Sequence, residues 1–266
     1  MATELRPMLA GLTDRLPVGR GWRYEPKWDG FRCLAAVDRS GRVILSSRRG
    51  TDLTLAFPDV AAAVANVLPA GTLVDGELVR WGADGRLDFE ALQRRNRSAG
   101  RGARELARTE PCHLIVFDVL ATAEHGDTTG RPLTERRELL ERLLADAEST
   151  EPAVVLGMQT DDVEVAEMWL EALGKVGVEG IVAKRPTGHY RPGARGWSKI
   201  KNYATTDVII GGVTGPIERP ESLVVGRIHR DDGRLHLAGR TTDLNPAAAE
   251  QVARMIEVAG AEHPWP

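Results

Sequence analysis

Lysine is rare in this chain, and one of its few lysines lies in a pattern that suits a nucleophile. Of the 35 basic residues, 30 are arginine and five are lysine: Lys27, Lys175, Lys184, Lys199 and Lys201. Arginine keeps its proton near neutral pH, whereas a lysine amine can lose it when cations or burial disfavour the charge. We therefore interpret the retained lysines as positions that need an ionisable amine, and nucleophilic attack is the clearest such use.

The strongest candidate is Lys27, which lies between two predicted strands in the run Glu25-Pro26-Lys27-Trp28-Asp29-Gly30-Phe31-Arg32. The pattern Lys-x-Asp-Gly is weak alone, because a surface turn with a solvated lysine would look the same. Four later segments strengthen it: Asp75-Gly76-Glu77, Phe117-Asp118, Glu179-Gly180-Ile181-Val182-Ala183-Lys184 and Trp197-Ser198-Lys199-Ile200-Lys201.

These segments together suit nucleotidyl transfer, in which Lys27 attacks the α-phosphate of a nucleoside triphosphate and pyrophosphate leaves. The attack needs a neutral amine, which nearby cations favour, and the developing phosphoryl charge needs fixed cations. Lys199 and Lys201 can supply both, since alternation puts them on one side of a strand.

The same inventory offers a metal site and a base-stacking ring. Glu77 and Glu179 are the best hard oxygen ligands for magnesium. Phe117 could face a purine ring, although a phenylalanine that closes an apolar strand is usually core. Lys184 either belongs to the site or is a solvated strand end.

The elements that must position these residues form a mixed pattern. We predict strands at 32–37, 42–46, 72–80, 113–119, 180–184 and 197–201, and helices at 57–67, 134–147, 163–175 and from Asp88. Strands at 207–213, 223–229 and 234–239 follow, then a helix at 245–259 capped by Asn245. Three strands and a helix are most of a small five-stranded barrel.

This pattern predicts an α+β chain with two domains, at 1–205 and 206–266. Because two strands of the barrel are missing before Pro266, we expect the second domain to be truncated and the natural protein to continue.

Composition narrows the class of protein. The formal net charge is −3, so the chain lacks the overall positive charge of a non-specific nucleic-acid binder. Any nucleic-acid surface must therefore be local. Two cysteines without paired spacing indicate neither a disulfide framework nor a zinc site. No apolar run is long enough to cross a bilayer. We expect a soluble cytoplasmic protein.

An arginine-rich stretch is the candidate local surface. We predict a mobile phosphate-binding loop that contacts DNA, against the plain alternative of a solvated linker. Its arginines are Arg94, Arg95, Arg97, Arg101 and Arg104, with Gly100 and Gly102 between them.

In their order along the chain, these segments and Ser47-Arg48-Arg49-Gly50 resemble the motifs of the ATP-dependent DNA ligases, within the covalent nucleotidyltransferase superfamily. The resemblance covers about residues 5–260. The chain looks similar to small bacterial ligases with one catalytic domain and an OB-fold, and to the ligase module of end-joining repair enzymes.

The resemblance implies an ATP-grasp-like adenylation domain of antiparallel sheets with flanking helices, followed by an incomplete OB-fold β-barrel. It also implies three reaction steps. Lys27 takes AMP from ATP with Mg²⁺ (or Mn²⁺ as a substitute), passes it to the 5′-phosphate of a nick, and AMP is released as the 3′-hydroxyl attacks.

Nucleotide contacts follow from the motif match. Phe117 is expected to stack on adenine with Val182 on its other face, and Glu25 to lie near the adenine edge. Glu77 is expected to hold the ribose and to assist the metal, and Glu179 to serve the metal.

Phosphate contacts follow in the same way. The resemblance implies that Arg32 touches the nucleotide or the nick phosphate, and that Arg48 touches the ribose and the DNA 5′-phosphate. Lys199 and Lys201 are expected to grip the α-phosphate.

The implied partners are nicked double-stranded DNA and a repair polymerase or end-binding protein, with the enzyme a monomer in the bacterial cytoplasm, associated with the nucleoid. The chain departs from the family at one end: the last motif, in the final OB-fold strands, does not occur before Pro266. Its absence affects chiefly the first step, self-adenylation from ATP.

Two alternatives remain open. One is an RNA ligase or a capping guanylyltransferase, and the other is a non-catalytic module that binds nicks. NAD as the AMP donor is disfavoured, because only 26 residues precede Lys27 and the zinc cysteines of such enzymes are missing.

Overall fold

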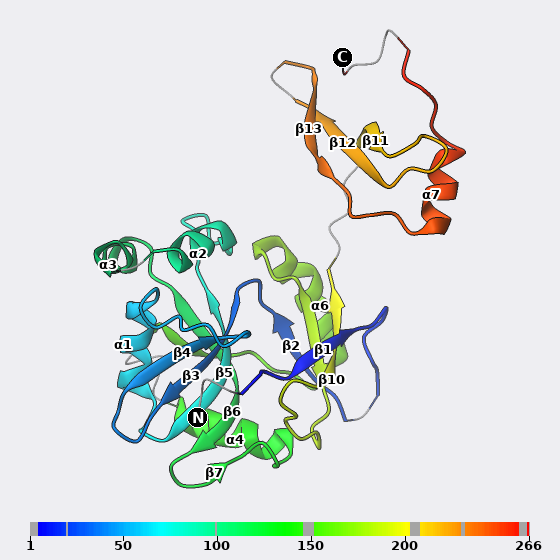
Figure 1. Cartoon of the computed structure of the whole chain (residues 1–266). Helices are drawn as coiled ribbons and strands as arrows, with labels where there is room; N and C mark the ends of the chain where they lie inside the picture. Colours follow the sequence, from blue (N-terminus) through cyan, green and yellow to red (C-terminus); the bar gives the residue numbers. More distant parts are fainter. Residues whose placement is uncertain are drawn as a thin grey trace. The chain divides into compact units, whose positions relative to one another are not determined.

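The computed structural model describes residues 5–19, 21–98, 100–145, 152–202, 208–229, 232–260 and 265. The chain forms two compact units, Met1–Tyr203 and Ala204–Pro266, which are drawn in Figure 1. Within the described residues, no helix has both the length and the apolar character that a membrane crossing requires.

The larger sheet of the first unit has six strands. The order β4-β3-β5-β6-β7 is antiparallel throughout, and β8 pairs with β6 in parallel. The strands are β3 (Phe31–Val37), β4 (Val43–Ser47), β5 (Thr72–Val79), β6 (His113–Thr122), β7 (Gly126–Asp127) and β8 (Val154–Leu156).

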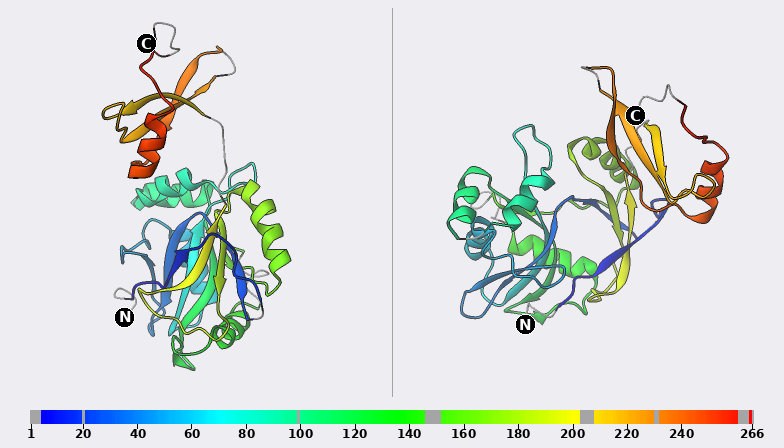
Figure 2. Two further views of the ribbon diagram at one scale, coloured as in Figure 1. Left: turned by 90° about the vertical axis from the view of Figure 1, so that its right-hand side faces the viewer. Right: turned by 45° about the horizontal axis from the view of Figure 1, so that its top comes forward.

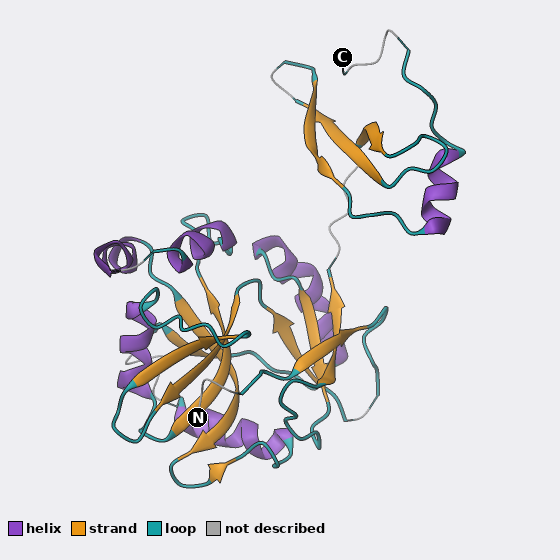
Figure 3. Cartoon of the chain, in the orientation of Figure 1, coloured by secondary structure: helices purple, strands orange, loops and turns teal. Residues whose placement is uncertain are grey.

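Helices cover one face of this sheet. Alternate residues such as Cys33, Ala35 and Val74 point to that face and are buried against α1 (Pro58–Val67) and α4 (Leu133–Leu143). Helix α1 begins with a proline, which suits the first helical position because its missing N–H needs no partner there. Figure 3 shows helices at the periphery of the first unit and strands in its interior.

The second sheet has four strands in the order β1-β10-β9-β2: β1 (Leu9–Leu12), β10 (Arg195–Lys201), β9 (Gly180–Lys184) and β2 (Arg23–Lys27). Only the β1–β10 pairing is parallel among them. Its outer face buries Tyr24, Ile181 and Ala183 against Ala166 of α6 (Val163–Ala172). A short 3₁₀ helix, η1 (Leu173–Val176), follows α6.

The inner faces of the two sheets meet. Leu34 and Leu120 of the six-stranded sheet pack with Met8, Tyr190 and Trp197, which belong to the four-stranded sheet or its connections. Figure 2 gives two further views of this arrangement. Polar residues on these facing surfaces are therefore directed toward one another.

The arginine-rich stretch is helical, so the prediction of a mobile loop there was wrong. Helices α2 (Phe89–Asn96) and α3 (Gly100–Thr109) occupy it. Asp88 caps α2 by accepting a hydrogen bond from Ala91 N at 2.9 Å. The buried side chains of Ala91, Leu92 and Ala103 give both helices an inward face.

The second unit contains the antiparallel sheet β11 (Ile209–Thr214), β12 (Ser222–Ile228) and β13 (Leu235–Arg240), and helix α7 (Pro246–Ala253). Asn245 caps α7 as predicted, but the helix is shorter than 245–259. The indole N–H of Trp265 donates to Leu235 O at 2.6 Å.

The predicted strands are all present, with ends shifted by at most three residues. The predicted α+β class with mostly antiparallel sheets is confirmed. The strands β1, β7 and β8 had not been predicted, since they are short and lack a clear alternation, and β2 had been expected beside the Lys27 run without bounds.

Candidate active site

Strand register brings the predicted cations onto the inner face of the four-stranded sheet. Strand β9 runs between β2 and β10, and directly opposed residues on neighbouring strands point to the same face. Two rows therefore cross the sheet on one side: Lys27, Gly180 and Lys201, then Glu25, Val182 and Lys199.

Lys27 forms an ion pair with Glu179, the residue immediately before β9. The backbone fixes this contact, because Glu179 N donates to Lys27 O at 2.8 Å. Burial acts to raise the pKa of Glu179, but the hydrogen bond and charge of Lys27 lower it below its ordinary value. Glu179 is therefore a carboxylate at neutral pH, and it holds the Lys27 amine in place.

Cations crowd this end of the sheet. Burial, followed by the charges of Lys27 and Lys201 and a smaller effect of Arg48, lowers the pKa of Lys199, while Glu179 opposes that shift. Arg48 lies in the exposed turn after β4. Since four positive side chains act at one place, an anion such as a phosphate would be favoured there.

The facing sheet contributes Arg32 and Glu77, which are opposed across β3 and β5. Arg32 donates two hydrogen bonds to Asp75, from Nε at 2.5 Å and from Nη2 at 2.6 Å. Burial raises the pKa of Glu77 to about 8, although Arg32 and Lys27 oppose the shift. Burial therefore favours the neutral form of Glu77, and an added cation would favour its carboxylate.

Phe117 lies where β6 bulges opposite β5, and its ring is half-buried against the inner faces. The Arg32 guanidinium carbon and the Lys184 Nζ are each 4.6 Å from its ring centroid. The Trp197 ring meets it edge-on at 6.3 Å. Phe117 and Val182 belong to one cluster, which is compatible with the predicted pair of purine contacts but leaves it a prediction.

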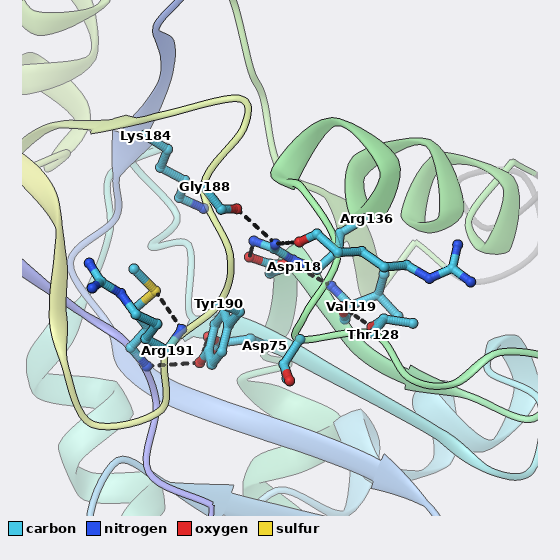
Figure 4. Close-up of polar contacts among 12 residues, drawn as sticks. Asp75, Asp118, Val119, Thr128, Arg136, Lys184, Gly188, Tyr190 and Arg191 are labelled. Atoms are coloured by element: carbon cyan, nitrogen blue, oxygen red, sulfur yellow. Dashed lines mark hydrogen bonds and ion pairs between the residues drawn. The ribbon is translucent and has the colours of Figure 1, made fainter.

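Glu25 and Lys184 form a buried pair, so Lys184 is not a solvated strand end. Lys184 Nζ is 2.7 Å from Glu25 Oε2, with side-chain exposures of 1% and 5%. Gln159 Nε2 donates to the other Glu25 oxygen at 2.8 Å. Figure 4 shows Lys184 together with Gly188 and Tyr190 of the connection that follows β9.

The carboxylates fit a magnesium ion only in part. No group of three or more histidine, cysteine, aspartate or glutamate side chains suited to a metal occurs among the described residues. Magnesium commonly uses one or two carboxylates and completes its shell with substrate phosphates and water. Glu77 and Glu179 meet that smaller requirement, and the positive charge of Lys27 acts to lower the pKa of both carboxyl groups.

The prediction that Arg95 contacts DNA, made together with Arg48, Arg94 and Arg97, was wrong. The Arg95 side chain is fully buried, and its guanidinium pairs with Asp59 at 2.6 Å and donates to Glu110 O at 2.7 Å. Arg94 and Arg97 are exposed, although Arg94 pairs with Glu110 at 2.8 Å. The correction follows from helix geometry, which turns the middle of three neighbouring arginines inward.

Three residues at the site had not been singled out from the sequence: Asp75 as the partner of Arg32, Tyr190 and Gln159. Asp75 belongs to a quoted motif, so its acidic side chain was a usable signal. Tyr190 and Gln159 lie in connections where a single sequence carries no periodicity, and only the fold brings them near the site.

Comparison with known proteins identifies relatives of the chain. A family model described as the ATP dependent DNA ligase domain matches residues 7–201. DNA ligase C2 of Mycolicibacterium smegmatis is 36% identical over 265 residues, which cover 97% of this chain and 72% of that protein. The multifunctional non-homologous end joining DNA repair protein LigD of Mycobacterium tuberculosis is 32% identical over 213 residues, which cover 79% of this chain but 25% of that protein.

Among solved structures, mycobacterial DNA ligase D complexed with ATP and MES is similar, with a TM-score of 0.60 and 31% sequence identity. The similarity covers 90% of this chain and 73% of that one.

Gly180 allows a test of the register. A Cβ atom at Gly180 would lie 1.9 Å from Ile200 O of the neighbouring strand. We expect Gly180→Ala to lower the free energy of unfolding by about 1–3 kcal/mol, the usual cost of overpacking. Denaturant unfolding measures this loss.

Gly130→Ala is the matched control, because nothing lies within 4 Å of the added atom. Equal stability of the two variants would contradict the close pairing of β9 with β10.

Proposed function

The chain belongs to the family of ATP-dependent DNA ligases, and from that premise we propose that it seals DNA nicks by carrying AMP on Lys27. The observation that carries the proposal is the ion pair of Lys27 with Glu179, on the sheet face that also presents Lys199 and Lys201. The family match also favours a DNA ligase over an RNA ligase, a capping enzyme or an inactive nick-binding module.

In the first step, Lys27 Nζ passes its proton to the paired Glu179 carboxylate and attacks the α-phosphorus of ATP. A P–N bond forms to Lys27, the bond to the bridging oxygen breaks, and pyrophosphate leaves with its electron pair. Lys199 and Lys201 stabilise the charge on the α-phosphate oxygens. An oxygen of the nick 5′-phosphate then attacks the phosphorus of AMP, and the P–N bond to Lys27 breaks. The 3′-hydroxyl loses its proton to solvent and attacks the 5′-phosphorus, and AMP leaves with its electron pair.

The nucleotide is proposed to bind between the two sheets. Phe117 stacks on adenine, Val182 contacts the opposite face of the base, and Glu25 accepts a hydrogen bond from the edge of the base. Glu77 accepts a hydrogen bond from the ribose. The half-buried ring of Phe117 and its packing near Val182 support this assignment.

Arg32 and Arg48 are proposed to contact phosphate and sugar. Arg32 is held by Asp75 at the inner end of the site. The positive charge of Arg48 contributes to the lowered pKa of Lys199, which supports its place near the phosphates.

Glu77 and Glu179 are the residues we propose to hold Mg²⁺, with Mn²⁺ as a substitute. When bound, the ion would neutralise charge on the phosphates. Their position beside Lys27 supports this assignment.

The second unit is proposed to be part of an OB-fold, because a three-stranded antiparallel sheet and a capped helix form most of that small barrel. We propose nicked duplex DNA as the partner of the whole chain. The protein is proposed to act as a monomer and to associate with the bacterial nucleoid. The name of the related LigD supports a role in end-joining repair, and a polymerase or an end-binding protein is proposed as a further partner.

The covalent step has a direct test. Incubation with ATP and Mg²⁺ is expected to raise the intact mass of the chain by one adenylyl group, and Lys27→Ala to abolish that gain. Lys175→Ala is the control, because Lys175 lies in η1 and outside the motif segments. An adduct that persists in Lys27→Ala would refute the assignment of the nucleophile.

The exposed arginines of α2 have a separate test. Replacing Arg94 and Arg97 with alanine should make the slope of log K for nicked DNA against log salt less negative by about 1.8, since each phosphate contact contributes about −0.9. The double variant Arg39→Ala, Arg142→Ala removes the same charge from two other exposed positions. Equal slopes for the two double variants would contradict the assignment of Arg94 and Arg97 as DNA contacts.

A further inference from the structure

Arg32 is fixed more firmly than a single ion pair requires. In addition to its two hydrogen bonds to Asp75, its Nη2 donates to Met8 O at 3.2 Å. The guanidinium carbon lies 4.6 Å from the Phe117 ring centroid and 5.2 Å from that of Trp197. The orientation of Asp75 therefore decides where the guanidinium points.

Tyr190 sets the orientation of Asp75. Its hydroxyl donates to Asp75 Oδ2 at 2.6 Å and accepts from Met8 N at 2.9 Å. A tyrosine hydroxyl has one proton, so the direction of both hydrogen bonds is determined. Asp75 and Tyr190 are buried, which means that water cannot replace this donor easily.

These contacts join the two sheets. Asp75 and Arg32 come from β5 and β3 of the six-stranded sheet, while Tyr190 lies between β9 and β10 and Met8 precedes β1. A polar bridge thus links the sheets next to the proposed nucleotide site. Figure 4 shows Tyr190 beside Asp75.

The connection that carries Tyr190 is itself anchored. Tyr190 N donates to Thr129 O at 2.9 Å. Arg136 Nη1 donates to Gly188 O at 3.0 Å, while its guanidinium pairs with the buried Asp118 at 2.7 Å. Because the backbone that leads into Tyr190 is held by these contacts, the hydroxyl has a fixed position from which to hold Asp75.

We propose that Tyr190 is a positioning residue of the ligation site, whose hydroxyl holds Asp75 and thereby aims Arg32 at the phosphate it binds. The proposal rests on the phosphate-binding role of Arg32 described above. Burial and the negative charge of Asp75 raise the pKa of Tyr190, so the hydroxyl remains a donor throughout the working pH range. Without it, Asp75 loses one of its donors and can rotate with Arg32.

The test compares Tyr190→Phe with Tyr24→Phe. Tyr24 is also buried, and its hydroxyl donates to Pro17 O at 2.7 Å, but it lies on the outer face of the four-stranded sheet. Tyr24→Phe loses one hydrogen bond and Tyr190→Phe loses two, so both variants should lose thermal stability and Tyr190→Phe should lose more. Single-turnover sealing of a nicked duplex that already carries AMP on its 5′-phosphate is expected to slow about tenfold in Tyr190→Phe, which corresponds to one lost charge-assisted contact. Tyr24→Phe should stay within about twofold of the wild-type rate on the same scale.

A double-mutant cycle separates positioning from general damage. If Tyr190 acts through Arg32, Tyr190→Phe should slow sealing less than about twofold in an Arg32→Lys background, because the coupled residues are non-additive. A full tenfold loss in that background, or equal sealing by Tyr190→Phe and Tyr24→Phe, would overturn the proposal.

The wild-type chain in the same assay keeps the two claims apart. Failure of the wild type both to form lysyl-AMP and to seal would count against the proposed function. Normal wild-type activity with an unaffected Tyr190→Phe would count against the positioning role alone.

Discussion

The pairing register of β2, β9 and β10 is the constraint on which the site depends. Side chains alternate along a strand, so a shift of one residue would turn Lys27 and its neighbours to the opposite face. That face is packed with Tyr24, Ile181 and Ala183 against α6 and has no room for ammonium groups. The apolar packing of one face therefore fixes the chemistry of the other, and the close approach of Gly180 to Ile200 tightens the register.

Buried ion pairs accompany this arrangement. Arg32 with Asp75, Arg136 with Asp118 and Lys184 with Glu25 each connect different elements. Such pairs contribute little net stability, because desolvation offsets much of their attraction, but breaking one leaves a costly uncompensated charge. Their value here is geometric: each pair fixes neighbouring elements on one side of the space between the two sheets, where a nucleotide is proposed to bind.

Much of the site could be predicted from local patterns. The strand that carries Lys199 and Lys201 has clear alternation, and its ends were close to those observed, whereas the strand that ends at Lys27 had been expected without bounds. The fate of Arg95 could not be predicted, since its partner Asp59 is 36 residues away and only the packing of α1 near α2 reveals it. Likewise, the contact of Tyr190 with Asp75 spans 115 residues, and a single sequence holds no signal for it.

A crystal structure of the chain after reaction with ATP tests the central claim most directly. The account predicts continuous density from Lys27 Nζ to the phosphorus of AMP, with Lys199 and Lys201 at the phosphate oxygens and adenine against Phe117. AMP joined to a different lysine, or bound outside the space between the two sheets, would contradict it.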